Sequence, residues 1–208
     1  PGALVKSLIT ATEAKTAALQ ELVTPSRYSR GLATGSGTDG IIVVSNPEAS
    51  LTLTDAGLHS KLGELIGQAV KSTTKKALAL ETGLSARRQY NVLERLKRFG
   101  LDQIFFKARF AACYPNKTTA FPYENMLSNL AGDGKWVTLT SILVHLQDQI
   151  DWELITYEDA LVITKQILAS LLDQNCNYAK GIPILYYLVD AINKTICRNI
   201  DKNEEELS

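Results

Sequence analysis

The chain contains few cysteines, few histidines and no excess of either charge. Its 208 residues include three cysteines, an odd number without the spacing of a metal site: Cys113, Cys176 and Cys197. Because no disulfide framework is present, a reducing, cytoplasmic location is expected. Lys plus Arg and Asp plus Glu both number 22. This balance argues against a general nucleic-acid-binding protein, which would carry a positive field.

Long hydrophobic runs are also missing. No apolar stretch is long enough to span a bilayer and no secretory leader is visible, so we expect no membrane partner. Hydrophobic residues make up 45% of the chain and charged residues 21%, which is typical of a globular protein with a substantial core. The chain opens on Pro1 instead of Met, so we expect its natural beginning to be missing.

The first 81 residues predict an α/β segment in the order helix, strand, helix. Apolar residues recur at helical spacing over residues 3–22, with small alanines that permit close packing. The β-branched run 40–45 predicts a buried strand. A second helix is expected over about 55–80, with Thr54 and Asp55 at its start. Gly63 and Gly67 on this helix predict close approach of another element.

From about Thr82 onward, helical patterns follow one another with scarcely any strand signal. We expect an all-helical domain of unassigned role over residues 82–202, followed by a frayed tail at 203–208. Thr156 and Asp159 predict a capping box at the start of one helix. The predicted helices cover residues 85–99, 101–112, 122–130, 137–150, 157–173 and 183–199.

The helix predicted over residues 85–99 carries four arginines on the side opposite its apolar residues: Arg87, Arg88, Arg95 and Arg98. Such a face is usually solvated. The functional alternative is docking to an acidic protein surface, to RNA or to the missing upstream part of the chain.

The most informative motif is the loop Ala33-Thr34-Gly35-Ser36-Gly37-Thr38-Asp39-Gly40. Its glycines allow close backbone approach, and it presents hydroxyls and a carboxylate beside the predicted strand. The simpler interpretation is that the side chains of Thr38 and Asp39 only cap or brace the turn. A phosphate-binding loop is not predicted, because this loop precedes a strand instead of joining a strand to a helix.

Three ordered blocks, residues 12–19, 33–39 and 56–67, resemble the adenosylcobinamide amidohydrolase family. They cover roughly the first eighty residues, which correspond to the C-terminal half of the family's domain. One departure is Ser36, which stands where the family is associated with Thr and keeps the hydroxyl. The resemblance implies hydrolysis of adenosylcobinamide to adenosylcobyric acid and aminopropanol in cobalamin salvage, with a corrinoid as the substrate.

Amide cleavage needs a nucleophile, donors for the oxyanion and an acid for the departing amine. With the resemblance, the catalytic candidates are Thr38 or Ser36 as nucleophile or water anchor, Asp39 as base, and His59 as a neutral proton acceptor near a helix N-terminus. The alternative for His59 is a core histidine bonded to a backbone carbonyl. The second histidine, His145, is expected to be structural.

Lys15 is a further catalytic candidate, expected to pair with Asp39 or Glu64 and position the loop; its alternative is a solvated side chain. The expected substrate-binding residues are Thr34, Gly35, Ser36, Gly37 and Glu64.

Glu13 and Glu64 belong to the matching blocks, yet each lies on a polar face of its own helix, which favours a surface role. No metal is expected, because His59 and Glu64 would point about 140° apart on one helix and no other ligands cluster nearby. No cofactor is expected either.

A noncatalytic protein is the competing interpretation. In it, the helical region is an interaction module and the N-terminal segment is a hydrolase remnant or a corrinoid-binding surface. The expected partners are a corrinoid and either the upstream half of the domain or a second copy of the chain. The resemblance leaves open whether the isolated chain is active.

Overall fold

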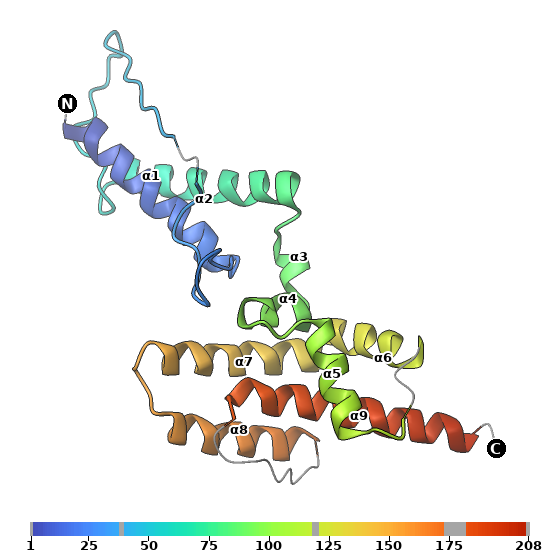
Figure 1. Cartoon of the computed structure of the whole chain (residues 1–208). Helices are drawn as coiled ribbons and strands as arrows, with labels where there is room; N and C mark the ends of the chain where they lie inside the picture. The colour runs from blue at the N-terminus through green and yellow to red at the C-terminus, as the bar shows by residue number, and fades with distance from the viewer. Residues whose placement is uncertain (1, 38–39, 118–120, 173–181, 207–208) are drawn as a thin grey trace. The chain divides into compact units, whose positions relative to one another are not determined.

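The computed structural model describes residues 2–37, 40–117, 121–172 and 182–206, and the described part of the chain is rich in helix (Figure 1). The chain divides into two compact units, a first unit of Pro1–Gln89 and a second unit of Tyr90–Ser208. Each unit is described by itself below. The expected domain roles, an amidohydrolase half and a helical region, stay predictions.

The first unit is built on two long helices, α1 (Gly2–Glu21) and α2 (Lys61–Thr82), followed by the short α3 (Ala86–Gln89). Its helix α1 buries only small side chains over most of its length, on an arc of about 100° at 100° per residue. These side chains let α2 approach closely, as the alanine pattern predicted. The buried residues on this arc are Ser7, Thr10, Ala11, Ala14 and Ala18.

Two lysines of α2 hold the C-terminal end of α1. Glu21 pairs with Lys71 at 2.8 Å and also with Lys75. These hydrogen bonds lower the pKa of the Glu21 carboxyl to about 2, from 4.5. A lowered carboxyl pKa means that the pairing stabilises the folded state above about pH 4.5 and is lost as the pH falls through about 2.

We therefore expect the Glu21 carboxyl to titrate near pH 2 in an NMR titration, and the protection of the end of α1 from hydrogen exchange to fall in the same range. Glu21→Gln should remove this pH dependence. Glu64→Gln is the matched control, because Glu64 pairs with Lys61 of its own helix. A Glu21 midpoint near 4.5 would contradict the expectation.

The predicted strand at 40–45 does not form, so the α/β assignment is wrong and only the helix-rich character is confirmed. Residues 40–45 have no regular secondary structure, and Ile42 and Val44 are 91% and 84% exposed. Among the described residues, β pairing is limited to one isolated antiparallel bridge between Pro25 and Leu32. A strand needs a partner for its backbone groups, and β-branched composition alone does not supply one.

Helix α2 begins six residues later than predicted. Its N-cap is Ser60, whose Oγ accepts from the backbone N–H of Gly63 at 3.0 Å. Thr54 is therefore not the N-cap, and the expected first-turn acid Asp55 instead accepts from the N–H of Gly57 and pairs with Lys6. This long-range ion pair makes Asp55 part of a loop before the helix. Gly83, at φ 71°, ends α2.

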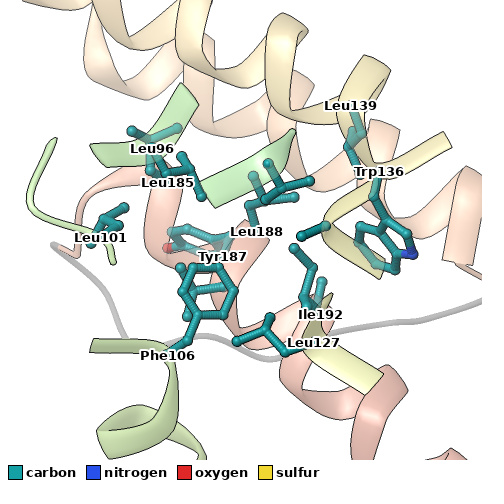
Figure 2. Packing of buried hydrophobic residues seen from close by; sticks show 14 of the residues in the cluster. Leu96, Leu101, Phe106, Leu127, Trp136, Leu139, Leu185, Tyr187, Leu188 and Ile192 are labelled. Atoms are coloured by element: carbon teal, nitrogen blue, oxygen red, sulfur yellow. The ribbon is translucent and has the colours of Figure 1, made fainter. Parts of the chain in front are cut away.

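The second unit packs its helices around one apolar core (Figure 2). Its helix α9 (Ile184–Glu206) contributes Leu185, Tyr187, Leu188 and Ile192, which lie together with side chains of the surrounding helices. The surrounding elements are α4 (Val92–Leu96), η1 (Lys97–Phe99), α5 (Gln103–Cys113), α6 (Phe121–Gly132), α7 (Gly134–Asp151) and α8 (Tyr157–Leu172).

Most helices predicted for this unit are confirmed, with shifted ends. The capping box is also confirmed, because the hydroxyl of Thr156 donates to the Asp159 carboxylate at 2.7 Å and accepts from its N–H. Helix α9 continues through part of the expected tail, as far as Glu206. Within the described ranges, every helix is too short or too polar to cross a lipid bilayer.

The single helix predicted over 85–99 is instead broken into α3, α4 and η1. Asn91 interrupts it as the N-cap of α4, accepting from the N–H groups of Leu93 and Glu94. The solvated-face interpretation is wrong for Arg98. Its side chain is only 3% exposed and forms a bidentate pair with Asp148 of α7 at 2.7 and 2.6 Å.

Candidate functional site

The base of the glycine-rich loop is tied to the C-terminal half of α1. The hydroxyl of Thr16 donates to the carbonyl of Thr34 at 2.8 Å, and the amide of Gln20 donates to the carbonyl of Ala33 at 2.9 Å. The next four residues of the chain are candidate site residues and lie in an exposed loop: Thr34, Gly35, Ser36 and Gly37. Thr38 and Asp39 lie outside the described residues, so their proposed roles stay predictions.

A second loop, residues 55–60, is held by the N-terminal half of α1. The hydroxyl of Thr10 donates to the carbonyl of Ala56 at 2.9 Å, and Lys6 pairs with Asp55 at 2.9 Å. The hydrogen bond from Lys6, followed by that from the N–H of Gly57, lowers the pKa of the Asp55 carboxyl. These contacts fix the chain just before α2 and leave the tip of the loop to solvent.

His59 lies at this tip, exposed, in the turn immediately before the N-cap of α2. The alternative of a buried core histidine is therefore wrong. An imidazole in this position is open to a ligand from solvent and is carried by a loop that two contacts with α1 hold in place. The other histidine, His145, is exposed on α7 in the second unit.

Glu64 lies in the first turn of α2, exposed, and accepts hydrogen bonds from Lys61 at 2.8 Å and from Gln68 at 3.0 Å. The hydrogen bond from Lys61 lowers the pKa of its carboxyl. Glu64 and Glu13 line the same groove of about 370 Å³ between α1 and α2. No local sequence pattern predicts that these two carboxylates share a groove, because each lies on the polar face of a different helix. The one sequence signal that connects Glu13 and Glu64 is that both belong to the blocks that resemble the family.

Lys15 is half-buried on another side of α1, about 160° from Glu13 at 100° per residue. It therefore does not project toward the groove that Glu13 and Glu64 line. The carboxylate of Glu64 is already paired with Lys61. Asp39 lies outside the described ranges, so the pairing of Lys15 with Asp39 stays a prediction.

Helix α1 is thus a common support for both candidate regions. Its contacts through Thr10 and Thr16 are six residues apart, which corresponds to about 9 Å along the helix axis. His59 does not line the groove that Glu13 and Glu64 share in the described part of the first unit. Within the same part of the chain, no three His, Cys, Asp or Glu side chains are placed to hold a metal ion.

Gly63 fixes the position of the loop that carries His59. A Cβ at Gly63 would lie 2.0 Å from the carbonyl oxygen of Gly57, which is a backbone atom and cannot rotate away. The predicted close approach is therefore confirmed at this glycine, although the element that approaches is the loop. At Gly67 a Cβ would meet nothing within 4 Å.

We expect Gly63→Ala to displace residues 55–60 and to cost about 1–3 kcal/mol of stability in the first unit. Gly67→Ala is the matched control and should instead stabilise α2 by about 0.5–1 kcal/mol. Hydrogen exchange of residues 55–60, measured with thermal unfolding, checks both. Equal exchange in the two variants would contradict the role given to Gly63.

Comparisons with known proteins agree with the family resemblance of the three blocks. Residues 1–86 match the family model described as adenosylcobinamide amidohydrolase. An uncharacterized protein of Methanocaldococcus jannaschii is 44% identical over 78 residues, which are 37% of this chain and 30% of that relative. No solved structure matches. The resemblance is thereby confirmed, and the first 86 residues are similar to the adenosylcobinamide amidohydrolase family.

Proposed function

We propose that the first unit provides part of an amidohydrolase that converts adenosylcobinamide to adenosylcobyric acid and aminopropanol. The family match over residues 1–86 carries this proposal, because the matched segment contains every candidate site residue. The segment that is similar to the Methanocaldococcus jannaschii relative covers 30% of that relative's length. The activity of a whole enzyme is therefore proposed here for an assembly that includes this chain.

The reaction adds one water molecule across the amide. The water oxygen bonds to the carbonyl carbon, the carbon–nitrogen bond breaks, and a proton passes to the departing amine. His59 takes the proton from the attacking group and returns one to the amine nitrogen. Backbone N–H groups of the loop at Gly35–Gly37 stabilise the negative charge on the carbonyl oxygen. Thr38, Ser36 and Asp39 remain the candidates for nucleophile, water anchor and base.

Substrate binding is assigned to the exposed loop 34–37 and to the groove that contains Glu64. A corrin ring carries several carboxamide groups on its edge, and a carboxylate is a strong acceptor for such N–H donors. Glu64 and Glu13 present two carboxylates in one groove. An open groove suits this substrate because a corrinoid is too wide for a closed pocket of this volume.

Lys15 is proposed to position the loop. We expect Lys15→Met to leave the fold intact and to abolish turnover, because Met keeps the apolar part of the side chain and removes the ammonium group. Lys76→Met is the control, since Lys76 is exposed on α2 and belongs to none of the three blocks. Unchanged turnover in Lys15→Met, measured by product formation, would rule out this role.

The direct test is incubation with adenosylcobinamide and chromatographic detection of adenosylcobyric acid. The 208-residue chain is assayed alone and together with the rest of an amidohydrolase domain. Product formation that needs this chain supports the proposal. Unchanged substrate in both assays, with correctly folded protein, contradicts it.

A noncatalytic corrinoid-binding role is the second candidate. It is favoured by one observation: apart from the half-buried Lys15, the candidate side chains within the described ranges are exposed, and of them only Glu64 lines the groove between α1 and α2. Binding of adenosylcobinamide without product would distinguish this role from hydrolysis.

A further inference from the structure

The hydroxyl side chains of α1 are not all bonded in the same way. Ser7 and Thr12 donate to the carbonyl four residues earlier on α1, at 2.8 and 2.9 Å, which is a common arrangement for a hydroxyl inside a helix. Thr10 lies between them and donates instead to the carbonyl of Ala56, 46 residues away along the chain, at 2.9 Å. The hydroxyl of Thr10 is therefore directed at the loop before α2 and not at its own helix.

The hydrogen bond from Thr10 is buried at both ends. Thr10 is 2% exposed and Ala56 is 0% exposed. The carbonyl of Ala56 is also packed against α2, because a Cβ at Gly63 would lie 2.8 Å from its oxygen. Water does not reach such a carbonyl easily, and a buried acceptor that loses its donor destabilises the arrangement around it. The position of Ala56 therefore depends on the hydroxyl of Thr10.

The ion pair between α1 and this loop is a weaker contact. Lys6 and Asp55 lie 2.9 Å apart, but their side chains are 57% and 49% exposed. Exposed ion pairs are screened by water and salt and contribute little to stability. Of these two contacts, the hydrogen bond from Thr10 therefore fixes the loop more strongly.

The anchored residue Ala56 is separated from His59 by two residues. The N–H and the hydroxyl of Ser60 both donate to the carbonyl of Gly57, at 2.9 and 2.8 Å, which closes a four-residue turn with His59 at its third position. This turn is held at one end by Thr10 through Ala56 and at the other end by Ser60, the N-cap of α2. The backbone position of His59 therefore follows from that of Ala56.

We propose that Thr10 is a positioning residue for His59 and acts through the carbonyl of Ala56. An acid–base residue must lie within hydrogen-bond reach of the reacting group, and a displacement of about 1 Å can slow a reaction about 10²-fold. The hydroxyl proton of Thr10 is held by Ala56, so Thr10 takes no part in proton transfer. The proposal rests on the proposed hydrolysis with His59 as its acid–base residue, whereas the anchoring of the loop can be measured without substrate.

Thr10→Val tests this role, because valine keeps the shape of the side chain and removes the hydroxyl. In the chain without substrate, hydrogen exchange at the Ser60 amide should become at least about 10-fold faster as the turn loosens. In the form of the protein that turns over adenosylcobinamide, kcat should fall about 10–100-fold while KM changes less than about 3-fold, since the geometry of the reacting groups is lost and not the binding. Thr10→Ser keeps the hydroxyl and should restore both values.

Thr12→Val is the matched control, because it makes the same substitution on the same helix and removes a hydroxyl that is bonded within α1. It should leave the exchange at Ser60 and kcat unchanged. Thr10→Cys keeps a weak donor and should lie between the serine and valine variants in both measurements. If Thr10→Val does not fold, as judged by thermal unfolding, the comparison of Thr10→Cys with Thr10→Ser decides.

Unchanged exchange at Ser60 in the folded valine or cysteine variant overturns the proposal. A normal kcat despite faster exchange also overturns it, because the position of the loop would then not matter for the chemistry. Equal losses in Thr10→Ser and Thr10→Val would show an effect of packing and would likewise overturn it. If the unsubstituted protein does not hydrolyse adenosylcobinamide, the proposed function fails and the catalytic part of this proposal fails with it, whereas the exchange at Ser60 still decides whether Thr10 anchors the loop.

Discussion

Replacing His59 with alanine is expected to slow hydrolysis of adenosylcobinamide by about 10²–10⁴-fold, the usual contribution of a general acid–base residue. The structure supports this choice because His59 is exposed at the tip of a loop that Thr10 and Lys6 fix to α1. The substitution removes no buried side chain, so the melting temperature should not change. The rate of product formation is measured in the form of the protein that turns over substrate.

His145→Ala is the matched control, because it removes the other exposed histidine from a helix of the second unit. It should leave the rate unchanged. Full activity in His59→Ala, with normal folding, would remove His59 from the mechanism and leave Thr38, Asp39 and Lys15 as the catalytic candidates.

Replacing Arg98 with alanine is expected to destabilise the second unit by about 3–5 kcal/mol, because it leaves the carboxylate of Asp148 buried without its charged partner. The two side chains are 3% and 10% exposed. The guanidinium carbon of Arg98 also lies 4.3 Å from the ring centre of Phe99, and this contact is lost as well. Urea unfolding followed by circular dichroism measures the change.

Arg198→Ala is the control for charge alone, since Arg198 is exposed on α9 of the same unit and should change stability by less than about 0.5 kcal/mol. The double variant Arg98→Met with Asp148→Leu should recover part of the loss, because an apolar pair leaves no buried charge. A loss below about 1 kcal/mol in Arg98→Ala would show that the pair is not structural.

The helices of the second unit were predictable because their apolar residues recur at helical spacing and their ends carry local signals. Thr156 and Asp159 are three residues apart, so their capping contact is visible in the sequence. The partner of Arg98 is fifty residues away, and no local pattern indicates it. The same arginine therefore looked solvated.

The first unit was harder to predict because its local signals depend on distant partners. The β-branched residues 41–44 have strand propensity, but no paired strand is present within the described ranges. Thr54 and Asp55 resemble an N-cap and a first-turn acid, yet Asp55 pairs with Lys6 on α1 and α2 begins at Lys61. Side-chain type alone could not distinguish these outcomes.

The candidate site was predictable as a set of residues but not as an arrangement. The three blocks identified the loop 34–37, His59 and Glu64, and the family match over residues 1–86 includes them all. The structure adds the support that α1 gives through Thr10 and Thr16, and the groove shared by Glu13 and Glu64. These depend on the packing of α1 and α2, which the sequence does not specify residue by residue.

The most direct test of the amidohydrolase proposal measures both products in one reaction. The chain, combined with the remaining part of an amidohydrolase domain, is incubated with adenosylcobinamide, and adenosylcobyric acid and aminopropanol are quantified together. The proposal predicts equal amounts of the two products and almost none with His59→Ala. Recovery of intact adenosylcobinamide from a folded complex that binds it would contradict the proposal and would favour a corrinoid-binding role.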